Sequence, residues 1–289
     1  MTAVPARAGL LCNPLSGTLA TLPDATSALR SAIAAAGFEL TAPPPAGAAL
    51  PRQWEAAVEG GATVVFVAGG DGTISAAAAM SMRQDIPLAL LPGGTMNRVC
   101  RQLGLTGDPV ASIARYRAGR EARLDVGLVG EEVFLFQSLI GAPVRLLRFR
   151  EMQRGQGIGG WLPLLRAALR RLLSPRQPSV VLKVPQQPRL RGSAAVIAVP
   201  APPGQGRFTL DVTRHAGVLG RLRQAIAWFR GAISADRSSV TIETSSLVAH
   251  GSGALMRFSV DGEMRLSPPP LRYRLRPAAL RVLLPGPPA

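Results

Sequence analysis

Lysine, aromatic residues and long apolar runs are all scarce in this sequence. Lys183 is the only lysine, so arginine supplies nearly all of the formal net charge of +16. Aromatic residues make up 4% of the chain, too few for the rows of stacking platforms that single-stranded nucleic acids require. No run of about 18 uncharged apolar residues occurs, and a transmembrane helix is therefore not expected.

The excess of arginine has two interpretations. It reflects an arginine-rich genome, or it attracts the chain to a polyanion. Because aromatic residues are few, an anionic membrane surface is favoured, and no nucleic-acid partner is expected. The length of 289 residues and the hydrophobic fraction of 47% indicate a globular chain of one large or two medium domains. Association into a homodimer stays open.

Cysteine is equally scarce. Cys12 and Cys100 are the only two, and no further cysteine stands at metal-ligand spacing, so a zinc site is not expected. Both suit reduced thiols in a protein core. The first nine residues lack the apolar segment of a signal peptide. We therefore expect a cytoplasmic protein that associates peripherally with the inner face of the cell membrane.

One stretch combines a strand, a glycine turn and a helix. Residues 64–68 are apolar or small and predict a buried strand, and the alanine-rich residues 74–82 predict a helix. Between them stands Gly69-Gly70-Asp71-Gly72-Thr73. Glycines allow the backbone to approach a bulky anion, and a helix N-terminus presents N–H groups to phosphate. A tight turn without a ligand is the alternative interpretation.

Two more turns follow predicted strands in the first half. Residues 8–12 predict a strand that ends in Asn13-Pro14-Leu15-Ser16-Gly17. Residues 86–91 predict another, followed by Pro92-Gly93-Gly94-Thr95-Met96-Asn97 and a helix over 98–103. Turns at the ends of parallel strands form the ligand crevice of a doubly wound sheet. Further helices are predicted at 22–36, 54–59 and 109–116. We expect an α/β domain over residues 1–123.

The pattern changes at Leu124-Asp125-Val126-Gly127. From there to residue 277, short strand-like runs separated by turn residues predict an antiparallel β domain. The predicted strands cover 124–129, 133–139, 180–184, 194–199, 208–212, 240–244, 255–260 and 271–275.

Two helical patterns interrupt this β region. In residues 161–173 the apolar side chains share one face, and Arg166, Arg170 and Arg171 occupy the other. Such a helix either packs on the β domain or lies in a membrane interface with its arginines on anionic headgroups. Residues 218–230 show a similar pattern, with Trp228 near Arg221 on the polar side.

Taken in order, the motifs resemble those of the diacylglycerol kinase catalytic-domain family, which includes sphingosine kinases and soluble bacterial lipid kinases. They are residues 13–17, 69–73, 92–97, 124–127 and Val260-Asp261-Gly262-Glu263. The resemblance implies a Rossmann-like α/β nucleotide domain, a β-sandwich domain for the lipid acceptor over 124–277, and a final segment, 278–289, that returns to the first domain. It also implies transfer of the ATP γ-phosphoryl group to a lipid hydroxyl, such as that of diacylglycerol, with Mg²⁺.

The resemblance also assigns roles to residues. Asp71 and Asp125 belong to the Mg²⁺ and nucleotide network, Asp261 is the general base for the lipid hydroxyl, and Glu263 stands beside it on the nucleotide side. No lysine lies near a glycine loop, so backbone N–H groups, hydroxyls and metal must hold the phosphates. The expected nucleotide cradle consists of Asn13, Ser16, Gly69, Gly70, Asp71, Gly72, Thr73, Gly94, Thr95 and Asn97.

Several positions depart from the family pattern. Arg98 stands where the family often has aspartate, and Gln205-Gly206 stands near the place of an Asp-Gly pair that helps a structural metal site. Two other functions remain open: an NAD kinase-like phosphotransferase, which shares the GGDGT turn, and a catalytically inactive lipid-binding protein. On its own, Asp261-Gly262-Glu263 favours a hairpin turn, and only the other motifs favour a site role.

Overall fold

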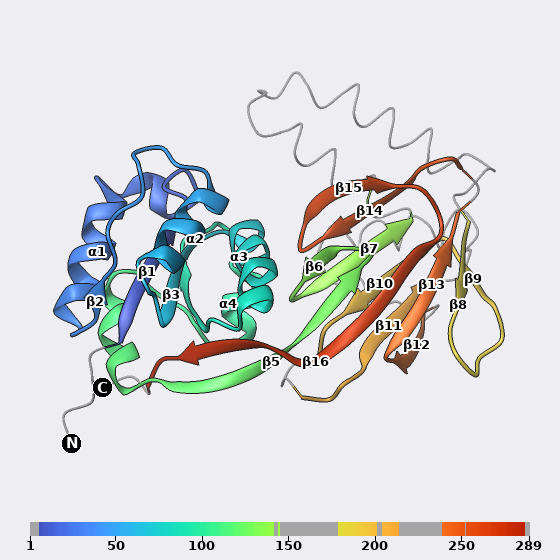
Figure 1. The fold of residues 1–289 in the computed structure, drawn as a ribbon. Helices are drawn as coiled ribbons and strands as arrows, with labels where there is room; N and C mark the ends of the chain where they lie inside the picture. Colours follow the sequence, from blue (N-terminus) through green and yellow to red (C-terminus); the bar gives the residue numbers. More distant parts are fainter. Residues whose placement is uncertain are drawn as a thin grey trace. The chain divides into compact units, whose positions relative to one another are not determined.

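The chain forms two compact units (Figure 1). The computed structural model describes residues 6–141, 144, 179–200, 204–213, 239–251 and 253–286. The first unit comprises Met1–Val126, Ala201–Gly206 and Arg276–Ala289, and the second comprises Gly127–Pro200 and Arg207–Leu275. The chain therefore crosses between the units four times.

A parallel sheet forms the centre of the first unit. Its strand order is β2-β1-β3-β4-β16, and neighbouring strands in this order pair in parallel. The strands are β1 (Arg7–Cys12), β2 (Glu39–Leu40), β3 (Val64–Gly69), β4 (Leu88–Pro92) and the second half of β16 (Leu271–Leu284). Strands β3 and β4 are buried along their whole length, which explains why their sequences are continuously apolar rather than alternating.

Helices cover this sheet. They are α1 (Ala25–Ala35), α2 (Leu50–Glu59), α3 (Asp71–Gln84) and α4 (Arg98–Gln102), with 3-10 segments η1 (Leu19–Thr21) and η2 (Ala111–Ala118). Phe66 of β3 lies between Phe38 and Tyr116, with ring centroids 5.1 and 5.4 Å away in edge-to-face geometry. The Tyr116 hydroxyl donates to the Leu90 carbonyl at 2.6 Å. Burying a large side chain of this kind contributes roughly 1.5–3 kcal/mol, so η2 is fixed to the sheet.

The second unit contains two facing layers of antiparallel strands. One layer has the order β12-β11-β10-β7-β14-β15. The other contains β9, β8, β13 and the first half of β16, together with β6 and the end of β5. The bounds are β5 (Arg120–Val129), β6 (Glu132–Phe134), β7 (Gln137–Gly141), β8 (Val180–Lys183), β9 (Leu190–Gly192), β10 (Ala194–Ala198), β11 (Phe208–Thr213), β12 (Ser239–Thr244), β13 (Ser246–His250), β14 (Met256–Val260) and β15 (Glu263–Ser267).

The core of the second unit lies between these layers. Phe134 stacks on Phe208 at 5.7 Å and meets Tyr273 edge-on at 6.3 Å, and all three are fully buried or nearly so. Gly127 is packed directly against the Phe134 ring, and a side chain there would collide with it. The glycine of the Leu124–Gly127 motif is therefore required for core packing.

The predicted fold class, an α/β unit and an antiparallel β-sandwich unit, is confirmed. Two element predictions were wrong in detail. The run over 133–139 forms two strands, β6 and β7, with a break at 135–136, and the helix predicted over 109–116 is a 3-10 segment. Strands β2, β9, β13 and β15 were not predicted, because they are short or contain several polar residues.

The predicted helices over 161–173 and 218–230 lie outside the described residues. Among the helices in the described ranges, none combines the length and the apolar character needed to cross a bilayer.

Candidate nucleotide-binding site

Three turns meet at the carboxyl ends of β1, β3 and β4. They are residues 13–17 after β1, residues 70–73 at the start of α3, and residues 93–97 after β4. Because the three strands are parallel neighbours, their carboxyl ends lie at one edge of the sheet. This is the edge where ligands bind in open α/β sheets. The structure therefore brings the three sequence motifs together, as their positions after parallel strands predict.

Contact between the turns is too close for side chains at the glycines. A Cβ atom on Gly94 would lie 2.5 Å from the Gly70 Cα, and one on Gly69 would lie 2.6 Å from the Thr73 side chain. Gly17, at φ +28°, packs directly on the backbone of Thr95. These glycines are needed for backbone-to-backbone packing even before a ligand is considered.

Side chains also join the turns through hydrogen bonds. The Ser16 hydroxyl accepts from the Gly70 N–H at 3.2 Å, and the Thr18 hydroxyl donates to the Gly94 carbonyl at 3.2 Å. Asn97 is in the left-handed region at φ 47°, and its side-chain amide makes two bonds with the Gly94 backbone, at 2.7 and 2.8 Å. Asn97 thus closes its own turn, which fixes the path of the backbone into α4.

Asp71 is the first residue of α3 and is 9% exposed. Its Oδ1 accepts from the Val99 N–H at 3.2 Å. Burial raises the pKa of the Asp71 carboxyl, and the Val99 N–H, the positive charge of Arg98 and the Arg98 N–H each offset part of that rise. The charge of Asp71 in turn adds to burial in raising the pKa of the Cys100 thiol to about 12. A single carboxylate is thus held where the glycine turns meet α4.

The comparison with protein families decides what this site resembles. Residues 7–129, which contain all three turns, match the model described as the diacylglycerol kinase catalytic domain. This part of the chain belongs to the diacylglycerol kinase catalytic-domain family.

Individual relatives agree with this assignment. A diacylglycerol kinase of Mycobacterium tuberculosis is 37% identical over 78 residues, which cover 27% of this chain and only 25% of the relative. A Staphylococcus haemolyticus protein named as an unproven lipid kinase is 23% identical over 237 residues, 76% of each chain. The crystal structure of a diacylglycerol kinase from Bacillus anthracis gives a TM-score of 0.66 at 17% identity, with 98% of each chain covered. The fold therefore corresponds over nearly the whole chain.

Asp125, the second aspartate that the family resemblance assigns to metal, has different surroundings. It lies on β5 in the first unit and is 2% exposed. Its Oδ2 accepts from the N–H groups of Gly204 and Gly206, both at 3.1 Å, and its Oδ1 accepts from the Ala278 N–H at 2.9 Å. Both carboxylate oxygens are thus bonded to backbone donors.

The fit of these aspartates to Mg²⁺ therefore differs. Mg²⁺ requires near-octahedral oxygen ligands and is often bound by one or two carboxylates together with substrate phosphates. Asp71 lies beside the glycine turns and could serve as such a ligand, although its Oδ1 also accepts from the Val99 N–H. Both oxygens of Asp125, by contrast, accept from backbone N–H groups of distant segments. Within the described ranges, no three or more His, Cys, Asp or Glu side chains gather where they could hold a metal ion.

Asp261 belongs to the second unit and lies in the two-residue turn between β14 and β15. Asp261 and Gly262 both have positive φ, 48° and 98°, as a hairpin turn of this length requires. The Asp261 Oδ2 accepts from the Leu135 N–H at 2.8 Å, and its Oδ1 accepts from the N–H groups of Phe136 and Gln137 at 2.9 Å. These bonds explain the break between β6 and β7, because they divert the N–H groups that a continuous strand would use in its ladder.

Glu263 is the first residue of β15 and is exposed. Its Oε2 accepts from Arg265 Nη2 at 2.7 Å, and Arg265 Nε also donates to Glu132 at 3.3 Å. At half-exposed positions such pairs contribute about 0–1 kcal/mol, so this cluster orients Glu263 without fixing the hairpin.

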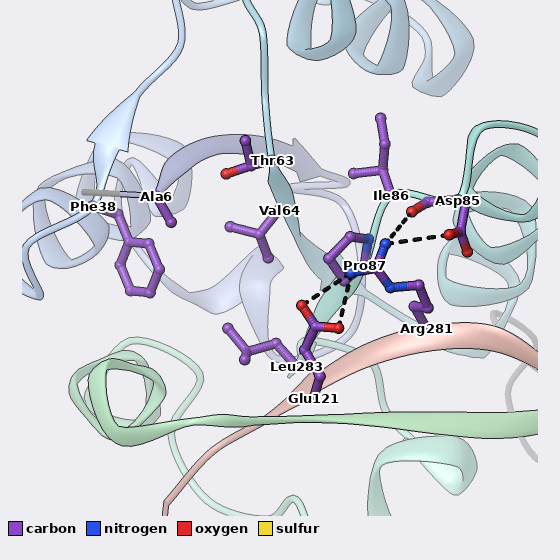
Figure 2. A pocket seen from close by; sticks show the side chains of 10 residues that line it. All are labelled: Ala6, Phe38, Thr63, Val64, Asp85, Ile86, Pro87, Glu121, Arg281 and Leu283. Atoms are coloured by element: carbon purple, nitrogen blue, oxygen red, sulfur yellow. Dashed lines mark hydrogen bonds and ion pairs between the residues drawn. The ribbon is translucent and has the colours of Figure 1, made fainter. Parts of the chain in front are cut away.

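A separate cavity lies at the opposite end of the parallel strands (Figure 2). It has a volume of about 460 Å³ and is lined by Ala6, Phe38, Thr63, Val64, Asp85, Ile86, Pro87, Glu121, Arg281 and Leu283. Arg281 of β16 donates to the Asp85 carbonyl at 2.9 Å and to both Glu121 oxygens at 2.8 and 3.0 Å. Val64 begins β3, whereas the glycine turn follows the carboxyl end of that strand, so this cavity is separate from the candidate nucleotide site.

Several participants were not predicted from sequence. Thr18 and the Val99 N–H, which follow the 13–17 and 92–97 motifs by one and two residues, contribute to the interlocked turns. Gly17 belongs to the first motif but was not among the expected contacts of the cradle. Gly204 and Ala278 bind Asp125 through their backbone N–H groups, and no sequence motif marks either residue. The Gln205-Gly206 departure from the family pattern did mark the segment that meets Asp125.

Proposed function

We propose that this protein is an ATP-dependent lipid kinase that transfers the γ-phosphoryl group to a lipid hydroxyl, such as that of diacylglycerol. The observation that supports it most strongly is the interlocking of three glycine turns at one edge of a parallel sheet, within a segment that belongs to the diacylglycerol kinase catalytic-domain family. The acceptor follows from the names of the M. tuberculosis and B. anthracis relatives.

The nucleotide phosphates would lie against these turns. Phosphoryl transfer depends mainly on positioning and on neutralising charge, and backbone N–H groups at a helix N-terminus supply both without a lysine. We assign this role to the turns and to α3, whose 14 residues begin at Asp71. The proposed contacts are Asn13, Ser16, Gly69, Gly70, Gly72, Thr73, Gly94, Thr95 and Asn97.

Magnesium would enter with ATP. Asp71 is the residue of this chain that fits as its protein ligand, together with the phosphate oxygens. When bound, Mg²⁺ would neutralise charge on the transferred group. Arg98, whose charge lies near enough to lower the pKa of Asp71, would add positive charge on the same side.

The acceptor side requires a proton acceptor. In the proposed step the bond between the γ-phosphorus and the ADP oxygen breaks, and a bond from the acceptor oxygen to that phosphorus forms. The hydroxyl proton passes to the Asp261 carboxylate, and ADP leaves with the electron pair of the broken bond. The three backbone donors to Asp261 hold its carboxylate in one orientation. Glu263, two residues on, is proposed to face the nucleotide.

Access to a lipid acceptor requires a membrane surface. The net charge of +16 favours anionic headgroups, and exposed charge attraction is screened over about 8–10 Å at physiological salt. Sedimentation with vesicles should therefore show binding that increases with anionic lipid and weakens as salt rises. Equal binding to neutral and anionic vesicles would contradict this part of the proposal.

The decisive test is a transfer assay with γ-labelled ATP. The purified protein receives diacylglycerol in mixed vesicles, a total lipid extract, or NAD, and the labelled product is identified by mass spectrometry. Labelled phosphatidic acid, absent with the Asp71→Asn variant, would support the proposal. Labelled NADP would identify a dinucleotide kinase instead. Vesicle binding without transfer to any acceptor would identify an inactive lipid-binding protein.

A further inference from the structure

The carboxylate of Asp125 gathers three segments that are distant in sequence. Its donors are the N–H groups of Gly204, Gly206 and Ala278, at 3.1, 3.1 and 2.9 Å. Asp125 is 2% exposed, so solvent does not replace these bonds. A buried carboxylate is costly unless hydrogen-bonded, and hydrogen bonds to a charged group are stronger than those between neutral groups. The three contacts together therefore hold the segments firmly.

The backbone at all three donors is in the left-handed region. The φ angles are 99° at Gly204, 67° at Gly206 and 49° at Ala278. Alternation of ordinary and left-handed residues makes N–H groups converge, which forms a concave site for an anion. For Ala278 this conformation is strained, because its Cβ approaches the following carbonyl oxygen. The chain accepts strain at Ala278 in order to point its N–H at Asp125.

These residues also mark the places where the chain passes between the two units. The crossings fall after residues 126, 200, 206 and 275, and each lies within a few residues of Asp125 or one of its donors. Asp125 precedes the first crossing by one residue, Gly206 stands at the third, and Ala278 follows the fourth. One carboxylate thus ties together all the segments that link the units.

We propose that Asp125 is a positioning residue and that it does not ligate the metal. It holds together the segments that link the two units, which we call the joint, and thereby limits relative movement of the units. A cation at Asp125 would have to displace three backbone N–H groups that occupy both carboxylate oxygens, whereas Asp71 lies beside the glycine turns. The consequence for phosphoryl transfer rests on the proposed function: a looser joint should slow transfer to the acceptor without weakening ATP binding.

The test measures movement between the units directly. Spin labels are attached to cysteines introduced at two exposed positions, Ala76→Cys on α3 and Leu266→Cys on β15. Double electron–electron resonance then gives the distribution of distances between the two labels. The native Cys12 and Cys100 are buried and should not be labelled. Asp125→Asn, which keeps the size of the side chain but removes its charge and one acceptor, should broaden the distribution. An unchanged distribution in folded Asp125→Asn protein would overturn the proposal.

Two control comparisons separate the joint from general loss of structure. Asp211→Asn changes another buried aspartate, one that accepts from Thr241 within the second unit, and should leave the distribution unchanged. Gly204→Ala and Gly104→Ala both place a methyl group in open space at positive φ. Only Gly204→Ala should broaden the distribution, so the pair also tests the joint if Asp125→Asn fails to fold. Equal behaviour of the two glycine variants would contradict the proposal.

Metal binding distinguishes a positioning role of Asp125 from a role as metal ligand. Mn²⁺ is titrated into the protein in the presence of ATP, and the electron paramagnetic resonance signal of the free ion is followed. The affinity for Mn²⁺ should be the same in wild type and Asp125→Asn. A tenfold or greater loss of Mn²⁺ affinity would restore Asp125 to the metal site. Because neither measurement depends on turnover, a broadened distribution in a protein that transfers no phosphate would uphold the joint and reject only the proposed function.

Discussion

The glycine turns allow a sharp comparison between two substitutions, Gly70→Ala and Gly94→Ala. A Cβ atom on Gly94 would lie 2.5 Å from the Gly70 Cα and 3.0 Å from Asn97 Oδ1, so the turn must move. A Cβ atom on Gly70 meets nothing closer than the Gly94 Cα at 3.7 Å and Ser16 Oγ at 3.9 Å. The backbone of Gly70, at φ −82° and ψ 179°, is also open to alanine. Two adjacent turns thus respond in opposite ways.

The expected changes in stability follow from these distances. Overpacking of the kind produced by Gly94→Ala costs about 1–3 kcal/mol. At about 2–4 °C per kcal/mol for a unit of this size, the melting temperature should fall by several degrees. Gly70→Ala restricts the unfolded chain without straining the native one, an effect worth about 0.4–1 kcal/mol in favour of folding. Its melting temperature should stay the same or rise slightly.

Nucleotide affinity should separate the two variants from simple stability effects. If phosphates lie against the Gly70 backbone, a methyl group there should weaken ATP binding about tenfold or more, which corresponds to about 1.4 kcal/mol or more. Calorimetric titration with ATP measures this, and a thermal scan of the same sample confirms folding. Wild-type ATP affinity in Gly70→Ala protein would refute the phosphate site. Wild-type stability in Gly94→Ala protein would refute the steric argument.

Three further predictions concern ionisable side chains. Because burial raises the pKa of Asp71, its contribution to stability is complete at low pH and is lost as pH rises through that pKa. Asp71→Asn should therefore be no less stable than wild type in urea at pH 7 while losing transfer by orders of magnitude; lower stability at pH 7 would contradict the pKa argument. Asp261→Asn should slow single-turnover transfer about 10²–10⁴-fold with ATP affinity unchanged. Glu263→Gln should also weaken ATP binding. A normal saturated rate in Asp261→Asn protein would exclude Asp261 as the base. Cys12 and Cys100, both buried and with raised thiol pKa, should resist a thiol reagent at pH 8 until urea is added; labelling of the native protein would show that this region opens.

Much of the first unit is readable from sequence because its signals are local. A short apolar run such as 64–68, bounded by turn residues, is typical of a buried strand, and the glycines directly after it are typical of a turn into the next helix. Strand order then follows, since parallel strands place their turns at one edge. For these reasons the meeting of residues 13–17, 69–73 and 92–97 was predictable without coordinates.

The sequence was less informative where a backbone contact decides the structure. The apolar run over 133–139 reads as one strand, yet the Asp261 carboxylate, more than 120 residues away, takes three of its N–H groups and divides it. No local pattern records such a bond. The short polar strands β9, β13 and β15 were missed for a related reason, because their stability comes from neighbours in the sheet.

The surroundings of Asp125 were decided entirely by tertiary structure. The Leu124–Gly127 motif marks the residue as important, and the family resemblance assigns it to metal. Its partners, however, are backbone N–H groups from Gly204, Gly206 and Ala278. Nearly every residue has such a group, so the residue types do not reveal which of them bind Asp125. Local composition determined the sheet, its turns and the identity of the carboxylates. Only the folded chain determined which carboxylate lies at the glycine turns and which has both oxygens bonded to backbone N–H groups, because that depends on where distant N–H groups converge.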